Sequence, residues 1–386
     1  MSDADRVQLA YAEEDSYGVL TATTGQELRF AGESLRQDTT VAVSKEIRDD
    51  RQVTDVVRTS IKAMGDINFE LSYGTLDDFF QAALFASAWS SAVNVAAEST
   101  NVGSGDGVYT AASGTPFSTM AANQWVKITG ASNAANNGYF KITAVGGSGA
   151  SITTTNSASV TEGPVDLTYS MGAQIVNGTT FNHYSIERCY ADLSNQYSLF
   201  SGMAVDALSL AIPSDNIITG AVGFAGKDED STTSTVFSTA ITDANTNEVM
   251  NSIDNVASAL ENGSSISLTQ LNFALANGLR GKPQIANLGP VGYGSGKCTV
   301  TGVLQQYYET AALMDKYLDQ TESSLSVRVA DDAGNCYIFD WPQIKFGTGQ
   351  RVAGGEETDV IADVSWRAYM DASEGITMRI ARFPIA

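Results

Sequence analysis

Apolar and polar residues alternate along several stretches of the chain, which is the pattern of half-buried β-strands. Residues 27–35 (ELRFAGESL) and 39–47 (TTVAVSKEI) follow it, and residues 66–74 (DINFELSYG) follow it most regularly. Side chains at every second position of a strand share one face of a sheet. In the last stretch these are large and apolar: Ile67, Phe69, Leu71 and Tyr73. All three stretches are therefore predicted strands.

The pattern changes at residues 75–89 (TLDDFFQAALFASAW), where the apolar residues have helical spacing. One stripe of a helix would hold Leu76, Phe79, Phe80, Ala83 and Leu84. Thr75 and Asp78 have the spacing of a capping box, with Asp in place of the usual Glu or Gln. We expect a helix that packs its apolar stripe on the predicted strands.

Small polar residues dominate from residue 92 to residue 176, between stretches that resemble each other on either side. Short predicted strands such as QWVKITG and GYFKITAV occur there, joined by turn-forming residues. Large aromatic side chains are few, so any core must be small. We interpret residues 92–176 as an inserted small β module.

Two parts of the chain are similar to each other. Residues 47–56 (IRDDRQVTDV) align without a gap with residues 279–288 (LRGKPQIANL), which places Arg48 on Arg280 and Gln52 on Gln284. Predicted strands and a helix follow both segments in the same order. Matching blocks in a matching order indicate an internal duplication.

The duplication defines the predicted organisation. We expect a mainly β protein with two tandem β-sandwich domains, each flanked by a helix. The polar stretch between them is predicted to be a flexible linker. Within the second copy, residues 249–263 fit a helix or a strand, and we favour a strand that ends at the Asn262-Gly263 turn. The predicted limits are 1–91 with 177–230 for the first domain, 92–176 for the module, 231–244 for the linker and 245–386 for the second domain.

Composition excludes several functions. The 386 residues carry a formal net charge of −22, which opposes binding to nucleic acid through its phosphates. There is one histidine, His183, and the three cysteines are scattered, so we expect no zinc site or triad built on several imidazoles. Glycine-rich SGDG and GGSG lack the context of a phosphate loop, and KDEDS lacks calcium-loop spacing. No catalytic, cofactor or metal site is predicted, nor any membrane span or secretory signal.

Several segments, taken in order, resemble the tail tube proteins of long-tailed, siphovirus-like bacteriophages. In the second copy these are SLTQLNFALANGLRG, GKCTVTGVLQQYYETAALMDKYL, SSLSVRVADDAGNCYIFDWPQIKFGTG and VIADVSWRAY. In the first copy LFSGMAVDALSLAI and IITGAVGFAGK resemble the last hairpin of that family. The resemblance does not extend to residues 92–176.

This resemblance implies a structural virion protein and no enzyme. Its tube domain is a β-sandwich with a flanking helix, and six such domains surround a channel. With two domains per chain, a homotrimer would form each pseudo-hexameric ring. Rings would stack into a tube through which DNA passes without specific binding. The implied partners are further copies of the chain and the tail terminator, tape-measure and distal tail proteins, assembled in the host cytoplasm into a virion tail.

Two sets of residues are hypotheses for this assembly. Arginine forms two-pronged hydrogen bonds with carboxylates, so we expect the repeated loops to make contacts between subunits or rings. The residues concerned are Arg48, Gln52, Arg280 and Gln284. An acidic channel would repel DNA phosphates, and its candidate residues are Glu70, Asp206 and Asp363. The inserted module would face outward, because a bulky domain would block the channel.

Other functions remain open at this point. The tube of a contractile tail or of a secretion-type injection machine would have the same features, since the sheath is a different protein. A surface adhesin would also be acidic and rich in glycine and threonine. A carbohydrate-active β-sandwich would need a concave site with paired carboxylates.

Overall fold

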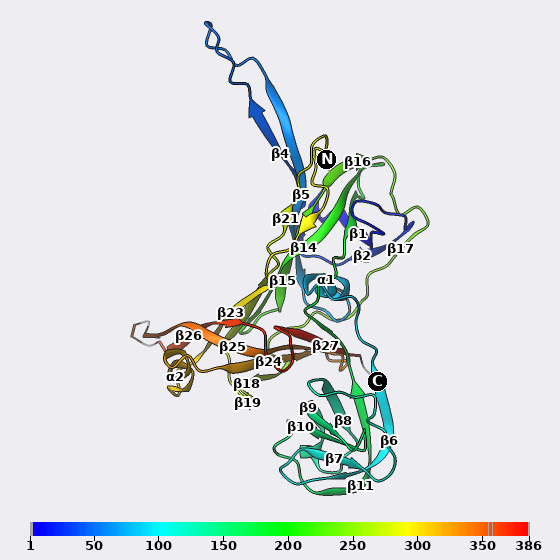
Figure 1. The fold of residues 1–386 in the computed structure, drawn as a ribbon, viewed down its shortest axis with the longest axis vertical. Coiled ribbons are helices and arrows are strands. Elements are labelled where there is room, and N and C mark those ends of the chain that lie inside the picture. The colour runs from blue at the N-terminus through cyan, green and yellow to red at the C-terminus, as the bar shows by residue number, and fades with distance from the viewer. Residues whose placement is uncertain (1–2, 354, 357, 385–386) are drawn as a thin grey trace.

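The computed structural model describes residues 3–353, 355–356 and 358–384. It consists almost entirely of strands, with two short α-helices, and the mainly β fold class predicted from the sequence is confirmed. Figure 1 shows an elongated molecule: a long hairpin projects from one end, and a small separate barrel forms the opposite end. The main body lies between them.

The first part of the body combines a strongly bent sheet with the helix α1 (Asp77–Ala83). Its strands are β1 (Val7–Glu13), β2 (Thr24–Leu28), β3 (Gly32–Glu33), β4 (Arg36–Val43), β5 (Val56–Glu70), β13 (Tyr184–Tyr190), β14 (Tyr197–Pro213), β15 (Thr219–Gly226) and β16 (Asp228–Thr232). The first half of the long strand β14 pairs with β13 and β16, and its second half pairs with β15. β14 therefore belongs to two layers.

The second part has the helix α2 (Ala312–Leu318) and a matching set of strands. These are β18 (Val256–Glu261), β20 (Gln270–Ala276), β23 (Thr299–Tyr307), β24 (Ser323–Ala330), β25 (Cys336–Ala353), β26 (Val360–Ala368) and β27 (Arg379–Phe383). β25 resembles β14: its first half pairs with β24 and β27, and its second half with β26.

The two parts repeat one order of paired strands. In the first part the pairs are β4–β5, β5–β15, β15–β14, β14–β13, β13–β1 and β14–β16. In the second they are β20–β23, β23–β26, β26–β25, β25–β24, β24–β18 and β25–β27. The same topology therefore occurs twice, and we call the parts the first and second copies. The residue limits of the domains given above remain a prediction.

The inserted module is a closed barrel with its own core. Its strands are β6 (Val93–Val102), β7 (Val108–Ala111), β8 (Trp125–Thr129), β9 (Gly138–Gly146), β10 (Ser151–Thr154) and β11 (Glu162–Met171). Tyr109, Ile128 and Tyr169 are buried at its centre. The next strand, β12 (Ala173–Val176), pairs with β27 of the second copy and so belongs to the body. The chain enters and leaves the barrel at one point, where Ser90 and Gln174 exchange hydrogen bonds of 3.0 Å.

α1 lies between the copies and is shorter than the predicted 75–89. The carbonyl oxygens of Leu84 and Phe85 accept hydrogen bonds from Gly178 and Thr180, which pairs this segment with another part of the chain and ends the helix. The predicted capping box is wrong: Leu76 occupies the N-cap position without a side-chain cap. The apolar stripe is buried as predicted: Leu76, Phe79, Phe80, Ala83 and Leu84.

The second copy covers the other side of α1. Phe80 packs against Tyr337 with 5.6 Å between ring centroids, and the Tyr337 hydroxyl donates a hydrogen bond of 2.5 Å to Asp77. Asp77 also pairs with Arg382. Burial raises the pKa of the Asp77 carboxyl, and the hydrogen bond from Tyr337 and the Arg382 guanidinium act against that rise. A largely buried carboxylate thus joins the two copies.

The stretch predicted to be a flexible linker is bound to the first copy. Its strand β17 (Ala240–Thr242) pairs in parallel with β2, and Phe237 is buried. The Glu187 carboxylate accepts a hydrogen bond of 2.7 Å from the Val236 amide. The predicted flexibility is wrong because this one apolar side chain and the paired strand fix the segment.

Residues 256–261 form the strand β18, as favoured from the sequence. Asn262 and Gly263 both have positive φ, 49° and 75°, which suits the tight hairpin turn to β19 (Ser264–Ser265).

Candidate channel face and assembly edges

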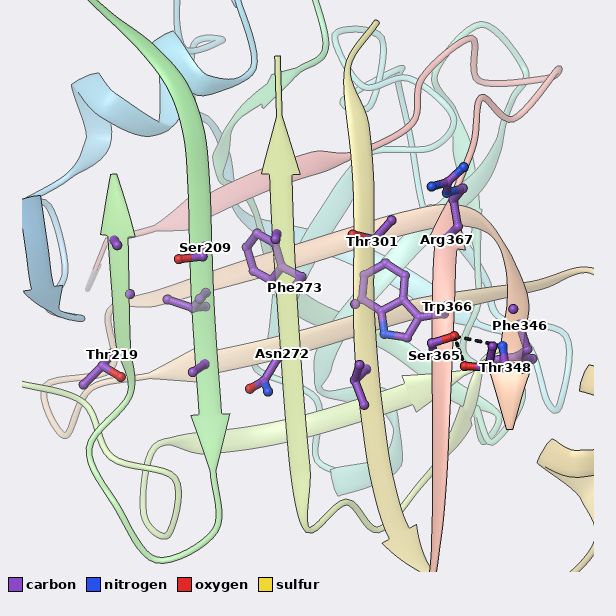
Figure 2. Close-up of a pocket in the computed structure, with 18 of the residues that line it drawn as sticks. Ser209, Thr219, Asn272, Phe273, Thr301, Phe346, Thr348, Ser365, Trp366 and Arg367 are labelled. Atoms are coloured by element: carbon purple, nitrogen blue, oxygen red, sulfur yellow. Dashed lines mark hydrogen bonds between the residues drawn. The ribbon is translucent and has the colours of Figure 1, made fainter. Parts of the chain in front are cut away.

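One continuous sheet crosses both copies. Its strand order is β4, β5, β15, β14, β20, β23, β26 and the second half of β25, and β3 lies beside β4 along β5. We call it the concave sheet, because one of its faces encloses a hollow of about 1140 Å³. Figure 2 shows its middle strands side by side, with Ser209, Asn272, Thr301 and Ser365 on neighbouring strands.

Alternation along the strands separates two kinds of side chain. Those pointing away from the hollow form the core, such as Phe69, Leu210, Phe273, Val300 and Val364. Those on the hollow face are small or polar: Asn68, Ser209, Ala211, Thr219, Ala221, Asn272, Ala274, Thr301, Val303 and Ser365. A sheet with this division has one face for a core and one face for solvent.

Two glycines let aromatic rings pack tightly behind the hollow face. A β-carbon at Gly302 would lie 2.4 Å from the ring of Trp366 on the neighbouring strand. In the first copy a β-carbon at Gly220 would lie 2.4 Å from the ring of Phe69. These contacts require glycine at both positions.

The structure places two of the three predicted channel carboxylates on the hollow side of the sheet. Glu70 follows Asn68 at the strand period and lies opposite Thr219. Asp363 precedes Ser365 at the same period and accepts a hydrogen bond of 3.2 Å from Gln305. The face also carries the cations Lys345 and Arg367, so its charge is mixed.

The third predicted carboxylate, Asp206, has a different position. It lies at an irregularity of β14, between the paired residues Val205 and Ala207. Its carboxylate accepts a hydrogen bond of 2.8 Å from the Leu279 amide, and its carbonyl accepts one of 2.8 Å from Asn277. Asp206 therefore anchors the start of the loop that follows β20.

The repeated loops, which we predicted to make equivalent contacts, are held differently. The loop at residues 277–298 folds back on the first copy: Leu288 accepts a hydrogen bond of 3.1 Å from the Ile61 amide, and the Tyr293 hydroxyl donates one of 2.7 Å to Gly226. Its short strands β21 (Arg280–Gly281) and β22 (Tyr293–Gly294) pair with each other. Arg280 donates to the Ser295 carbonyl at 3.3 Å.

The corresponding loop of the first copy is the tip of the β4–β5 hairpin, which projects away from the body (Figure 1). Arg48 donates hydrogen bonds of 2.8 and 2.5 Å to Asp50 of the same tip. Gln52 is exposed beside it, and Gln284 lies in the folded-back loop, where its carbonyl accepts from Asn287 at 3.2 Å. The structure thus does not bring Arg48 and Gln52 near Arg280 and Gln284 within one chain.

The hairpin also exposes apolar side chains that the sequence analysis did not select. They are Val41, Val43, Ile47, Val53, Val56 and Val57, and Ile47 is fully exposed. A cluster of exposed apolar residues on a projecting strand pair indicates an interaction surface. The available signal was the run of valines and isoleucine on both sides of the charged tip.

The two outer strands of the concave sheet have open edges. β3 and β4 pair only with β5, and the second half of β25 pairs only with β26, among the residues that the structure describes. Open edges present unpaired backbone groups that can bind another strand.

The barrel is fixed to the second copy on the side of β25 and β27. Trp125 packs with Cys336, Ile338, Ala381 and Phe383. Beside them the buried Asp340 carboxylate accepts hydrogen bonds from Trp125 at 3.3 Å and Arg379 at 2.9 Å, and Lys141 lies 3.2 Å away. The barrel therefore packs on a surface other than the hollow face.

Other candidate chemistry is absent from the described part of the chain. No group of three or more His, Cys, Asp or Glu residues is arranged to hold a metal there, and the three cysteines are free. His183 packs between Tyr17 and Phe181, and burial lowers its pKa. No helix among the described residues is long and apolar enough to cross a membrane.

A sheet with one small, polar hollow face and two open edges defines a structural subunit that assembles side by side with others. The comparison with family models agrees: the model for the phage tail tube protein family matches residues 4–368, and the chain belongs to that family. The family is structural and its members are components of the virion tail. No curated protein matches the chain.

Proposed function

We propose that this protein polymerises as stacked rings into the tail tube of a phage, and that the hollow face of the concave sheet lines the channel for the genome. The single observation that supports this best is the concave sheet itself. It runs through both copies, is hollow on one face and is open at both edges. Such a sheet closes when its edges meet those of other chains, and closure removes every unpaired edge.

The ring holds three chains in this proposal. Each chain contributes two copies of the same topology, so three chains supply the six similar domains implied by the resemblance to tube proteins with six-membered rings. A closed ring of identical chains is the usual outcome of a repeated head-to-tail contact.

The hollow face suits passage of DNA better than binding. Serine, threonine, alanine and asparagine dominate it, and Glu70 and Asp363 add negative charge. Short neutral side chains give phosphates no long cationic arms to hold, apart from Lys345 and Arg367. The chain as a whole is strongly acidic, with a net charge of −22. DNA therefore moves along the channel with few attractive contacts.

The projecting hairpin joins one ring to the next. Its exposed valines and Ile47 need a cover that the chain itself does not provide among the described residues. In a stack of rings the hairpin reaches the neighbouring ring, where these side chains become buried. The ends of the tube bind the tail terminator and distal tail proteins, and the channel holds the tape-measure protein before ejection.

Negative-stain electron microscopy of the purified protein, with averaged end views, tests this function. We expect hollow tubes with three outward lobes per ring, one for each barrel. A monodisperse monomer under all conditions of concentration and salt would contradict the proposal.

Charge reversal in the two repeated loops tests the stacking role. In Arg48→Glu with Arg280→Glu we expect folded subunits that form no long tubes, because the hairpin tip loses its pairing with Asp50 and its charge. Circular dichroism checks folding and microscopy measures tube length. Arg6→Glu, an exposed site distant from both loops, is the matched control for added negative charge. Tubes of normal length from the double variant would refute the role given to these loops.

A further inference from the structure

The joint between the two copies inside one chain is a strand pair in the concave sheet. β14 and β20 run antiparallel, with Ala207 opposite Ala276 and Pro213 opposite Gln270. Within this pair Ala211 lies opposite Asn272, and both line the hollow. Behind the pair the buried Asn277 side chain donates hydrogen bonds to Ala83 and Val205 at 3.0 and 3.1 Å.

Each strand of this joint has a counterpart at an open edge. β20 pairs with β23, the strand before α2, as β3 and β4 pair with β5, the strand before α1. β14 and β25 correspond because each is bent and belongs to two layers. The joined strands β14 and β20 therefore correspond to the open strands β25 and β3–β4.

We infer that the joint between chains copies the joint within the chain: the second half of β25 pairs antiparallel with residues 30–36 of a neighbouring copy of this protein. This inference rests on the proposed function, because it names the contact by which rings close. It also explains why the two edges are open in a single chain. The repeated topology makes them complementary to each other and not each to itself, so the contact continues around a ring.

The register follows from the rows of paired residues. Ala211 lies between Thr219 on one side and Asn272 on the other. In the second copy the row that starts at Asp363 continues to Gln350, which corresponds to Ala211. Asn272 lies opposite Val303 as Gly32 lies opposite Asn68. Gln350 of one chain therefore faces Gly32 of the next, on the hollow side.

This pair allows a direct test by cross-linking. Gly32 accepts a side chain, because a β-carbon there would meet only Asn68 at 3.6 Å. Directly opposite residues of an antiparallel pair have β-carbons about 4.5–5.5 Å apart, close to the range of a disulfide. In assembled Gly32→Cys with Gln350→Cys, mild oxidation should give a ladder of covalent dimer and closed trimer on a non-reducing gel.

The matched control uses the joint within the chain. Ala211→Cys with Asn272→Cys should form the same bond at the monomer mass, detected as loss of free thiols. Each single variant controls for reaction with Cys189, Cys298 or Cys336, which are free.

The outcomes separate the inference from the proposed function. A ladder that ends at the trimer supports the joint and the three-chain ring. Tubes visible by microscopy without any cross-linked ladder would overturn the joint and leave the tube function standing. Monomers alone, in the unmodified protein as well, would contradict the proposed function itself.

Discussion

At the scale of single residues, Asp340 holds the barrel to the body. It is 3% exposed and accepts from Trp125, Arg379 and Lys141, while Glu374 shares both cations. Lys141 and Trp125 are about two hundred positions away in the sequence. No local pattern connects residues so far apart, and the sequence analysis accordingly did not find this cluster.

Asp340→Ala should lower the free energy of unfolding by about 3–5 kcal/mol, because removing one member of a buried charged group leaves its partners uncompensated. Denaturant unfolding of the unassembled chain measures it. Asp38→Ala is the control, since Asp38 is half exposed and pairs with an exposed Arg36, a kind of pair worth about 0–1 kcal/mol. A loss below about 1 kcal/mol for Asp340→Ala would show that Glu374 alone neutralises the cluster.

At the scale of elements, the regular strands could be predicted and their partners could not. Alternation identified the strand with Ile67 and Phe69, whose side chains are buried as expected. The helix was predicted too long because its end depends on hydrogen bonds to Gly178 and Thr180, far along the chain. Among the candidate site residues, Glu70 and Asp363 could be placed by strand period, whereas the position of Asp206 depends on an irregularity in β14.

The concave sheet offers a sharp test of strand packing. Gly302→Val should destabilise the second copy by about 1–3 kcal/mol or more, since the new side chain would overlap the Trp366 ring and the Asn272 carbonyl. Tryptophan fluorescence during unfolding reports it. Gly32→Ala, at another strand glycine of the same sheet, has room for the added methyl group and should change stability little. Equal stability of the two variants would mean that the packing behind the channel face is loose.

At the scale of the whole molecule, the duplicated topology was visible in the sequence because loops and strands recur in order. The different states of the two repeated loops were not visible. One loop is folded on its own chain and the other projects, although their sequences align. The difference arises from what lies beside each loop: the first copy adjoins residues 277–298, and the β4–β5 hairpin has a neighbour only in an assembly.

Removing the barrel tests its independence from the tube. The deletion should cover residues 93–171, since residues 173–176 form β12 and pair with β27. With a short glycine-serine join we expect tubes of normal width that lack outer lobes. The melting temperature should fall on the order of 10 °C, because apolar residues such as Ile338 and Phe383 become exposed.

Trp125→Ala is the companion variant, which keeps the barrel and removes its apolar anchor. It should show a smaller fall in melting temperature and retain the lobes. Loss of tubes on deletion would mean that the barrel takes part in assembly.

The bonded pair of Ser90 and Gln174 has a consequence for engineering. Two chain ends held this close form a ready-made splice point, where one folded unit can be exchanged for another without altering the path of the body. Any passenger domain whose own termini are adjacent meets that requirement. A polymer of such subunits would then display its cargo at a regular spacing along a filament, with one passenger for every chain.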